Sequence, residues 1–357
     1  MRLSSLRRVA ILVTLTCLSG GGVGAESFYQ LESALTIKSD SLPNWDYLAI
    51  DPIRPILYIT RREDGVLMYN TETKQLTGVL ENTKGGNAVT IVPELNRLFV
   101  TNTDGSLTIF QHSDLKLLAR NSYGESADNA FYDPATKQLL LTEGDQKKAV
   151  FVDATTNQKT AELPYDSEKL EGTAADGKGF MYMALRDRNK ILKIDMRTRQ
   201  VAAEWPTTGF TLPNGVAFDA ANNRLFVTTR GDNPSVLVFD ITTGKIIASP
   251  AIGRNNDVIV FDKETRKIYT SNGLDGTLVI IDQVDANTYK LAEATTTRPW
   301  ARTMAVDFKT KKVYLVTAEG TVDPSKTWKA SIAPFYPNKY FKDTFTLLTY
   351  RPQRARP

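Results

Sequence analysis

A short apolar motif recurs about every forty residues along this chain, and this repeat constrains the fold more than any other feature. Each copy is a tetrad rich in β-branched, aromatic and aliphatic residues, a composition typical of buried strands. Successive tetrads start 41 to 45 residues apart. The seven tetrads occupy residues 57–60, 98–101, 139–142, 181–184, 225–228, 268–271 and 313–316. Such spacing predicts a repeat array rather than two unrelated domains.

Turn signals on both sides of each tetrad divide the repeat into short strands. An acidic residue such as Asp51 or Asp133 precedes the tetrad by six residues in five of the seven copies. Turns that contain a glycine able to adopt positive φ follow several tetrads. These turns are Asp64-Gly65, Asp104-Gly105, Asp275-Gly276 and Glu319-Gly320. Four strands per repeat without helical periodicity predict an all-β, seven-bladed β-propeller.

The two ends of the chain are expected to close the ring. A strand predicted at 28–37 has no repeat of its own, and the last repeat ends near 350 without a fourth strand. If the N-terminal strand completes the last blade, both free sheet edges disappear. The expected blades are 45–86, 87–127, 128–171, 172–213, 214–256, 257–300 and 301–350 plus the N-terminal strand, followed by a disordered tail at 351–357.

The repeat resembles the YVTN-type propeller repeat over essentially the whole chain after residue 25. The resemblance rests on LYIT at 57–60, on LFVT at 98–101 and 225–228, and on aspartates that end the third strands at 153, 195, 240 and 282. With its N-terminal segment, the chain is similar to the exported bacterial family typified by YncE-like proteins. This resemblance implies a binding or interaction protein without an assigned reaction.

The first 25 residues have the pattern of a secretory signal peptide. Three arginines precede an apolar run at 9–18, and small residues end the segment at Ala25. Neither this run nor any later one is long enough to span a bilayer. We therefore expect a periplasmic or secreted protein. Removing residues 1–25 also removes Cys17, the only cysteine, and changes the net charge from +4 to +1, which argues against broad nucleic-acid binding.

Polar residues begin the innermost strand of every predicted blade. They lie five residues before the repeat acid, where strand propensity would not select them. The seven are Asp46, Asn87, Asp128, Glu171, Asn214, Asp257 and Arg302. Ring closure would bring them to one mouth of the central channel, beside Trp45 and Trp300. The simplest alternative is a hydrated mouth whose strand starts tolerate turn-forming residues.

A divalent cation is one candidate ligand for this mouth. Clustered carboxylate and amide oxygens favour Ca²⁺ or Mg²⁺. The segments at Glu171, Asn214 and Asp257 are similar to those of gluconolactonase-like propellers, and this resemblance implies that the three residues are metal ligands. It also implies a metal-dependent hydrolase or lactonase. In a third interpretation, Arg302 pairs with carboxylates and the remaining groups hold a cationic or hydroxylated ligand.

Four arginines are predicted near the ends of second strands on the same face. They are Arg61, Arg62, Arg186 and Arg230, and we favour solvated side chains paired with the nearby Glu63, Asp187 or Asp232 over an anion site. A loop from 318 to 343 interrupts the last blade and is too long for a hairpin turn. Its aromatic residues indicate a lid or partner surface over the mouth. They are Trp328, Phe335, Tyr336, Tyr340 and Phe341.

Several classes of chemistry are excluded or disfavoured by composition. One His and one Cys cannot build a histidine-rich zinc site, a Cys₄ finger or an iron–sulfur cluster. His112 is expected as a solvated turn residue on the face opposite the mouth. The sequence thus predicts a monomeric exported protein that holds a small molecule or an exported protein at the mouth and is less suited to catalysis. The alternatives are a metal-dependent hydrolase and a protein–protein interaction module.

Overall fold

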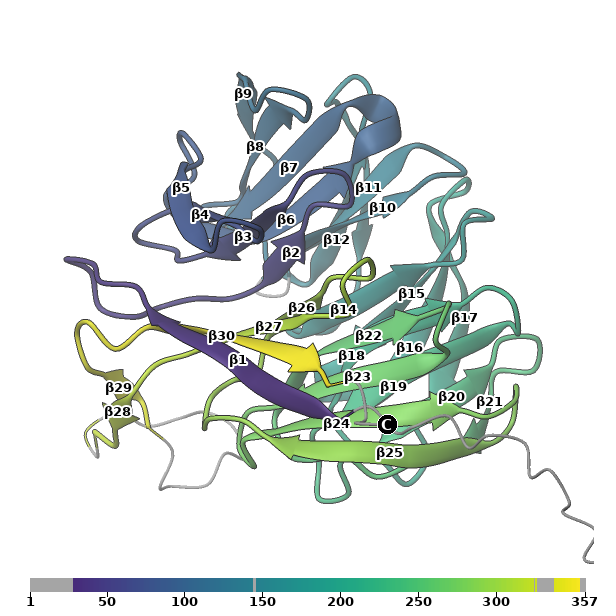
Figure 1. Ribbon diagram of the computed structural model, residues 1–357. Coiled ribbons are helices and arrows are strands. Elements are labelled where there is room, and N and C mark those ends of the chain that lie inside the picture. The colour runs from purple at the N-terminus through teal and green to yellow at the C-terminus, as the bar shows by residue number, and fades with distance from the viewer. Residues whose placement is uncertain (1–27, 144–145, 324, 326–336, 354–357) are drawn as a thin grey trace, which may run out of the picture.

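Seven four-stranded antiparallel sheets form a ring around a central channel, as the sequence predicted (Figure 1). The computed structural model describes residues 28–143, 146–323, 325 and 337–353. The predicted signal peptide lies outside these residues. Innermost strands of successive blades contact one another around the ring, and the first blade contacts the last.

The first four blades follow one another along the chain, and each runs from the channel outward. Blade 1 contains β2 (Leu48–Ile50), β3 (Ile56–Thr60), β4 (Val66–Asn70) and β5 (Gln75–Val79). Blade 2 contains β6 (Gly86–Val92), β7 (Arg97–Asn102), β8 (Ser106–Gln111) and β9 (Leu117–Ser122). Blade 3 contains β10 (Asn129–Asp133), β11 (Gln138–Glu143), β12 (Lys148–Asp153) and β13 (Lys159–Pro164). Blade 4 contains β14 (Leu170–Ala175), β15 (Phe180–Leu185), β16 (Lys190–Asp195) and β17 (Gln200–Pro206).

The remaining blades repeat this order until the last one, which recruits the N-terminal strand. Blade 5 contains β18 (Pro213–Asp219), β19 (Arg224–Thr229), β20 (Val236–Asp240) and β21 (Lys245–Ala248). Blade 6 contains β22 (Asn256–Asp262), β23 (Lys267–Asn272), β24 (Thr277–Gln283) and β25 (Tyr289–Thr296). Blade 7 contains β26 (Met304–Val306), β27 (Val313–Thr317), β30 (Thr346–Pro352) and β1 (Tyr29–Thr36).

The tetrads form the second strand of each blade and supply the core. In β11 every residue is buried, and Leu57, Phe99 and Leu225 are fully inaccessible to solvent. Adjacent blades cover both faces of these strands, which explains why the tetrads are continuous apolar runs rather than alternating ones. The outermost strands face water, and all five residues of β5 are exposed.

The predicted ring closure is confirmed. β1 pairs antiparallel with β30, from Thr36 opposite Thr346 to Tyr29 opposite Pro352. The phenol of Tyr29 also donates to the carbonyl of Lys311 at 2.8 Å. The pairing corrects one expectation: the tail does not become irregular at 351, because Arg351 and Pro352 belong to β30.

The repeat acids fix the turns between first and second strands. Asp133 Oδ2 accepts from the backbone N–H of Thr136 at 3.0 Å, and Asp307 Oδ1 accepts from that of Lys309 at 2.9 Å. Blade 2 lacks the acid and instead has a short 3₁₀-helix at Pro93–Leu95. A second one lies at Arg186–Arg188. Among the described residues no helix is long and apolar enough to cross a membrane.

The interruption of blade 7 lies between β27 and β30. Its described part contains a two-stranded sheet of β28 (Gly320–Thr321) and β29 (Lys339–Tyr340). Gly320 therefore begins a strand, whereas Gly65 and Gly105 occupy the expected turns with φ of +81° and +75°. Of the aromatic residues predicted in this loop, Trp328, Phe335 and Tyr336 lie outside the described residues.

Candidate functional site at the channel mouth

The polar residues predicted at the mouth are held at the starts of the innermost strands by bonds between neighbouring blades. The backbone N–H of Tyr47 donates to the Asn87 carbonyl at 3.1 Å, which ties blade 1 to blade 2. The Asp257 N–H donates to the Arg302 carbonyl at 3.3 Å, which ties blade 6 to blade 7. Backbone position, rather than side-chain packing, therefore brings these residues to one end of the channel.

Three arginines from second-strand ends turn inward and pair with these inner-strand acids. Arg62 Nη2 lies 2.6 Å from Asp46 Oδ2, and Arg186 Nη2 lies 2.6 Å from Glu171 Oε1. Arg230 pairs with Asp257, and its Nε donates to the Asn256 carbonyl at 2.6 Å. The expectation of solvated arginines paired with Glu63, Asp187 or Asp232 is wrong for these three. Arg62 and Arg186 follow second strands that pair with the first strands preceded or begun by their acids, whereas Arg230 of blade 5 reaches across to Asp257 of blade 6.

Arg61, the fourth arginine of this group, has a structural role. Its side chain is only 1% exposed, pairs with Asp64 at 2.9 Å and lies 4.4 Å from the centre of the Phe345 ring. It therefore packs blade 1 against blade 7 and does not face the mouth.

Ion pairs and hydrogen bonds join blades 4, 5, 6, 7 and 1 in one continuous network. Arg186 Nη1 donates to Asn214 Oδ1 at 3.0 Å, and Asn214 Nδ2 donates to Asp257 Oδ1 at 3.4 Å. Arg302 Nη1 lies 2.8 Å from Asp257 Oδ2 and 3.9 Å from Asp46 Oδ1. The network runs through five of the seven blades, and the described residues of blades 2 and 3 do not contribute to it.

Asp128, from blade 3, is the exception among the mouth acids. Among the described residues its carboxylate has no hydrogen bond or ion pair. Burial, with Asp46 and Glu171 nearby, raises its pKa to about 7, although Arg62 and Arg186 partly oppose the shift. A carboxyl group without a partner in such surroundings is able to accept from a ligand or to exchange a proton near neutral pH.

The phenol of Tyr47 is a second polar group at the mouth that makes no hydrogen bond to the described residues. Burial raises the pKa of its phenol well above the usual value, and Asp128, Asp46 and Glu171 raise it further. The phenol therefore remains protonated and can act as a donor. Burial also lowers the pKa of Arg230 to about 9, assisted by the positive charges of Arg186 and Arg302.

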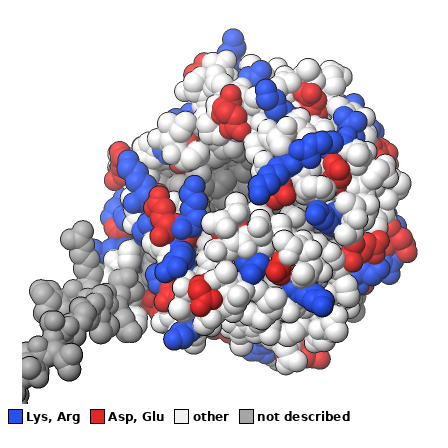
Figure 2. Space-filling model, turned by 90° about the vertical axis from the view of Figure 1, so that its right-hand side faces the viewer, with Lys and Arg blue, Asp and Glu red and all other residues white. Residues whose placement is uncertain are grey.

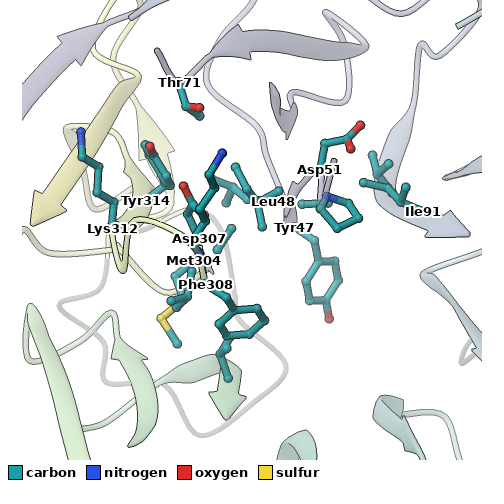
Figure 3. Close-up of a pocket in the computed structure, with 18 of the residues that line it drawn as sticks. Tyr47, Leu48, Asp51, Thr71, Ile91, Met304, Asp307, Phe308, Lys312 and Tyr314 are labelled. Carbon is teal, nitrogen blue, oxygen red and sulfur yellow. Dashed lines mark hydrogen bonds between the residues drawn. The ribbon is translucent and has the colours of Figure 1, made fainter. Parts of the chain in front are cut away.

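A large cavity lies beyond Tyr47, inside the channel. It has a volume of about 1330 Å³, and Figure 3 shows Tyr47 on its wall. Its lining is mainly apolar, whereas the charged residues of the mouth do not line it. Figure 2 shows the opposite face, hollowed at its centre, with both basic and acidic side chains around the hollow. The apolar residues that line the cavity include Val89, Ile91, Val258 and Val260.

This cavity was not predicted from the sequence. The only available signal was the presence of apolar residues at alternate positions of inner strands, as in Val258 and Val260. This pattern does not distinguish a channel wall from a packed core, because both favour apolar side chains.

The base of the blade 7 loop packs beside the mouth. The ring of Tyr340 lies 5.0 Å from that of Trp45 and 6.2 Å from that of Trp300. Both tryptophans are buried, and the Arg302 guanidinium lies 5.8 Å from the Trp45 ring. Phe341, by contrast, is 46% exposed. The tryptophans therefore anchor the loop beside the site.

The three predicted metal ligands contact the arginine network. Glu171 and Asn214 bind Arg186, and Asp257 binds two arginines. No group of three or more His, Cys, Asp or Glu side chains in the described part of the chain is arranged to hold a metal ion. The Ca²⁺ or Mg²⁺ site stays a prediction that these contacts do not support.

His112 lies on the opposite face, as expected, but it is buried and not solvated. Its Nε2 lies 2.9 Å from Asp51 Oδ2, next to Arg54. The turn after the third strand of blade 2 therefore contacts the turn after the first strand of blade 1. The sequence alone did not predict this contact.

Comparison with known proteins defines this chain as a β-propeller and goes no further. No family model matches the sequence, and no curated protein matches it. Among solved structures, hydrazine synthase from Kuenenia stuttgartiensis aligns with a TM-score of 0.66 at 14% identity, covering 79% of this chain and 94% of that one. A chain of the mitotic checkpoint complex aligns with a TM-score of 0.69 at 13% identity, covering 87% and 95%. At these identities the similarity establishes the fold alone.

Proposed function

We propose that this protein is an exported, YVTN-type propeller that binds a small ligand at the channel mouth. The observation that supports this proposal best is that most charged side chains at the mouth pair with one another while two polar groups do not. Four arginines and three acids hold one another in place, while the Asp128 carboxylate and the Tyr47 phenol have no hydrogen-bond partner among the described residues. A rigid polar frame around unused hydrogen-bonding groups is typical of a ligand site.

The partial exposure of three mouth arginines also favours ligand binding over a purely structural role. The side chains of Arg62, Arg186 and Arg302 remain 21–29% exposed, so a ligand can reach their unused N–H groups. The described base of the blade 7 loop packs beside the same mouth, where Tyr340 contacts Trp45.

A thermal-shift screen tests this proposal. The mature protein is heated alone and with millimolar amino acids, dicarboxylates, sugars, sugar phosphates and amines. We expect at least one class to raise the melting temperature, and the rise to disappear in Arg186→Gln and Asp128→Asn. Arg120→Gln is the control, because Arg120 pairs with Asp104 away from the mouth. Absence of any shift, or a shift that survives both mouth substitutions, would count against the proposal.

A further inference from the structure

The charges of the mouth are equal in number but unevenly distributed. Asp46 and Glu171 each have a close arginine partner, at 2.6 Å in both cases. Asp257 pairs with two arginines, Arg230 and Arg302, whereas Asp128 pairs with none of the arginines in the described part of the chain. The group around Asp257 therefore has an excess positive charge, and the position of Asp128 has an excess negative charge.

These two charges lie far apart around the ring. Asp128 immediately precedes the inner strand of blade 3, and Asp257 belongs to the inner strand of blade 6. The inner strands contact in blade order and close from blade 7 to blade 1. Blades 6 and 7 are consequently the blades most distant from blade 3, so the mouth has a negative side and a positive side.

A second unsatisfied acceptor lies beside Asp128. Asn87 is only 5% exposed, and its Oδ1 has no hydrogen-bond partner among the described residues. Its Nδ2 donates at 3.1 Å to the carbonyl of Ala127, the residue that precedes Asp128. Blades 2 and 3 thus offer acceptors without donors, which is costly unless a ligand or water supplies the missing donor.

The positive side of the mouth has N–H donors that lack acceptors among the described residues. Each guanidinium has five N–H donors in a planar fork. Asp257 offers only two oxygens to Arg230 and Arg302, so donors remain for an additional oxyanion. Arginine pairs are well suited to hold a carboxylate through two parallel hydrogen bonds.

We propose that the mouth binds a small zwitterion, with its ammonium group at Asp128 and its carboxylate at Arg230 and Arg302. This inference rests on the proposed function and specifies its ligand class. Free amino acids and short peptides share this chemistry and differ in the distance between their two charges. The Tyr47 phenol lies near the acidic side and can donate to a ligand carbonyl between the two ends.

Binding of this kind is coupled to protonation. The groups that face Asp128 are Asp46, Tyr47 and Arg62 from blade 1, and Glu171 and Arg186 from blade 4. An ammonium group beside Asp128 favours its ionised form, which opposes the raised pKa of about 7. Below pH 7 the ligand should therefore displace a proton from Asp128, and affinity should increase as the pH rises from 5.5 to 7.5.

Isothermal titration calorimetry with matched probes tests the inference. The zwitterions are glycine, glycylglycine and triglycine, which separate amino acids from peptides. N-acetylglycine lacks the ammonium group, and glycinamide lacks the carboxylate. We expect one zwitterion to bind at least about 10-fold more tightly than both single-charge probes. In two buffers of different ionisation enthalpy at pH 6.5, binding of that zwitterion should release a fraction of a proton.

Variants assign the two ends of the ligand. Asp128→Asn should weaken zwitterion binding about 10-fold or more and abolish proton release, whereas Arg120→Gln should change neither. Equal binding of a single-charge probe, or an unchanged affinity in Asp128→Asn, would overturn the zwitterion inference and leave the mouth as a binding site. Failure of all three zwitterions would also overturn it, and the wider screen would then decide the proposed function separately. Proton release by the parent protein tests the role of Asp128 even if the variant does not fold.

Discussion

At the scale of single residues, the half-buried Asp128 and the fully buried Glu143 have similar pKa values for different reasons. Asp128 faces the mouth beside other acids. Glu143 lies at the end of β11 with a fully buried side chain, and both of its oxygens have no hydrogen-bond partner among the described residues. Its closest cation is Lys148, at 3.7 Å. Burial raises the pKa of Glu143 to about 7, and Lys148 offsets only part of this effect.

Replacing Glu143 with Gln should therefore stabilise the protein at alkaline pH. The unfolded state releases this proton near pH 4.5, whereas the folded state retains it until about pH 7. Stability is consequently lost between these pH values and stays lower above them. We expect Glu143→Gln to gain ~1–3 kcal/mol at pH 8 and little at pH 4. Urea unfolding at both pH values measures the difference, with the exposed Glu168→Gln as control. An equal gain at pH 4 would contradict this explanation.

At the scale of strands and turns, polar contacts between blades reveal a pattern that the repeat alone did not show. Asp51 accepts from His112 of the next blade, and Asp219 accepts from Gln283 at 2.8 Å in the same relation. In blade 2 the repeat acid is replaced by Val92, which belongs to the same apolar cluster as Ala154. The valine that replaces the acid therefore packs in an apolar cluster with a residue of the next blade.

Loss of the histidine in this contact should weaken the junction between blades 1 and 2. Burial opposes ionisation of Asp51, but donors from the Arg54 and Ile53 backbones and from His112 keep its pKa below the usual value. His112→Ala should cost ~1–3 kcal/mol because it leaves a buried carboxylate with one donor fewer. Denaturant unfolding at pH 7 measures this loss, and Ser113→Ala is the exposed control.

The contribution of Asp51 has a definite pH dependence. Its folded-state pKa is lowered, so its stabilisation is present above the unfolded value of 3.8 and is lost as the pH falls below that value. The cost of His112→Ala should therefore shrink near pH 3. A cost that does not change with pH would show that packing, and not the ion pair, explains the loss.

The limits of sequence-based prediction follow from the same elements. Tetrads such as Leu57–Tyr58–Ile59 indicated the blades, because burial on both faces demands continuous apolar runs. The pairing of Arg186 with Glu171 could not be predicted, since the two residues approach only after their blade has folded. The environment of His112 depends in the same way on a neighbouring blade. Local patterns thus predicted which residues gather at the mouth but not their partners.

At the scale of the whole molecule, stability depends on the strand that joins the two ends of the chain. Deleting residues 28–36 should expose the edge of β30 and lower the melting temperature by roughly 5–15 °C, corresponding to a few kcal/mol. Differential scanning calorimetry and light scattering compare this variant with a chain that begins at residue 26. Equal melting temperatures would show that the ring does not depend on β1.

The whole ring also gives the mouth its polarity. Blades 5 to 7 position Arg230, Asp257 and Arg302, and blade 3 positions Asp128 on the far side of the channel. Neither an open sheet nor a single blade could place these charges opposite each other. Both the proposed ligand and its proton coupling depend on the unpaired state of the Asp128 carboxyl group.

The most direct test is a ¹³C NMR titration of the aspartate carboxyl groups, with Asp128→Asn used to assign the resonance. The structure predicts a midpoint near pH 7 for Asp128 in the free protein, because burial and the neighbouring acids disfavour its charged form. A midpoint at or below pH 4 would show that Asp128 is paired or fully hydrated, and it would contradict the presence of an unpaired carboxyl group at the mouth.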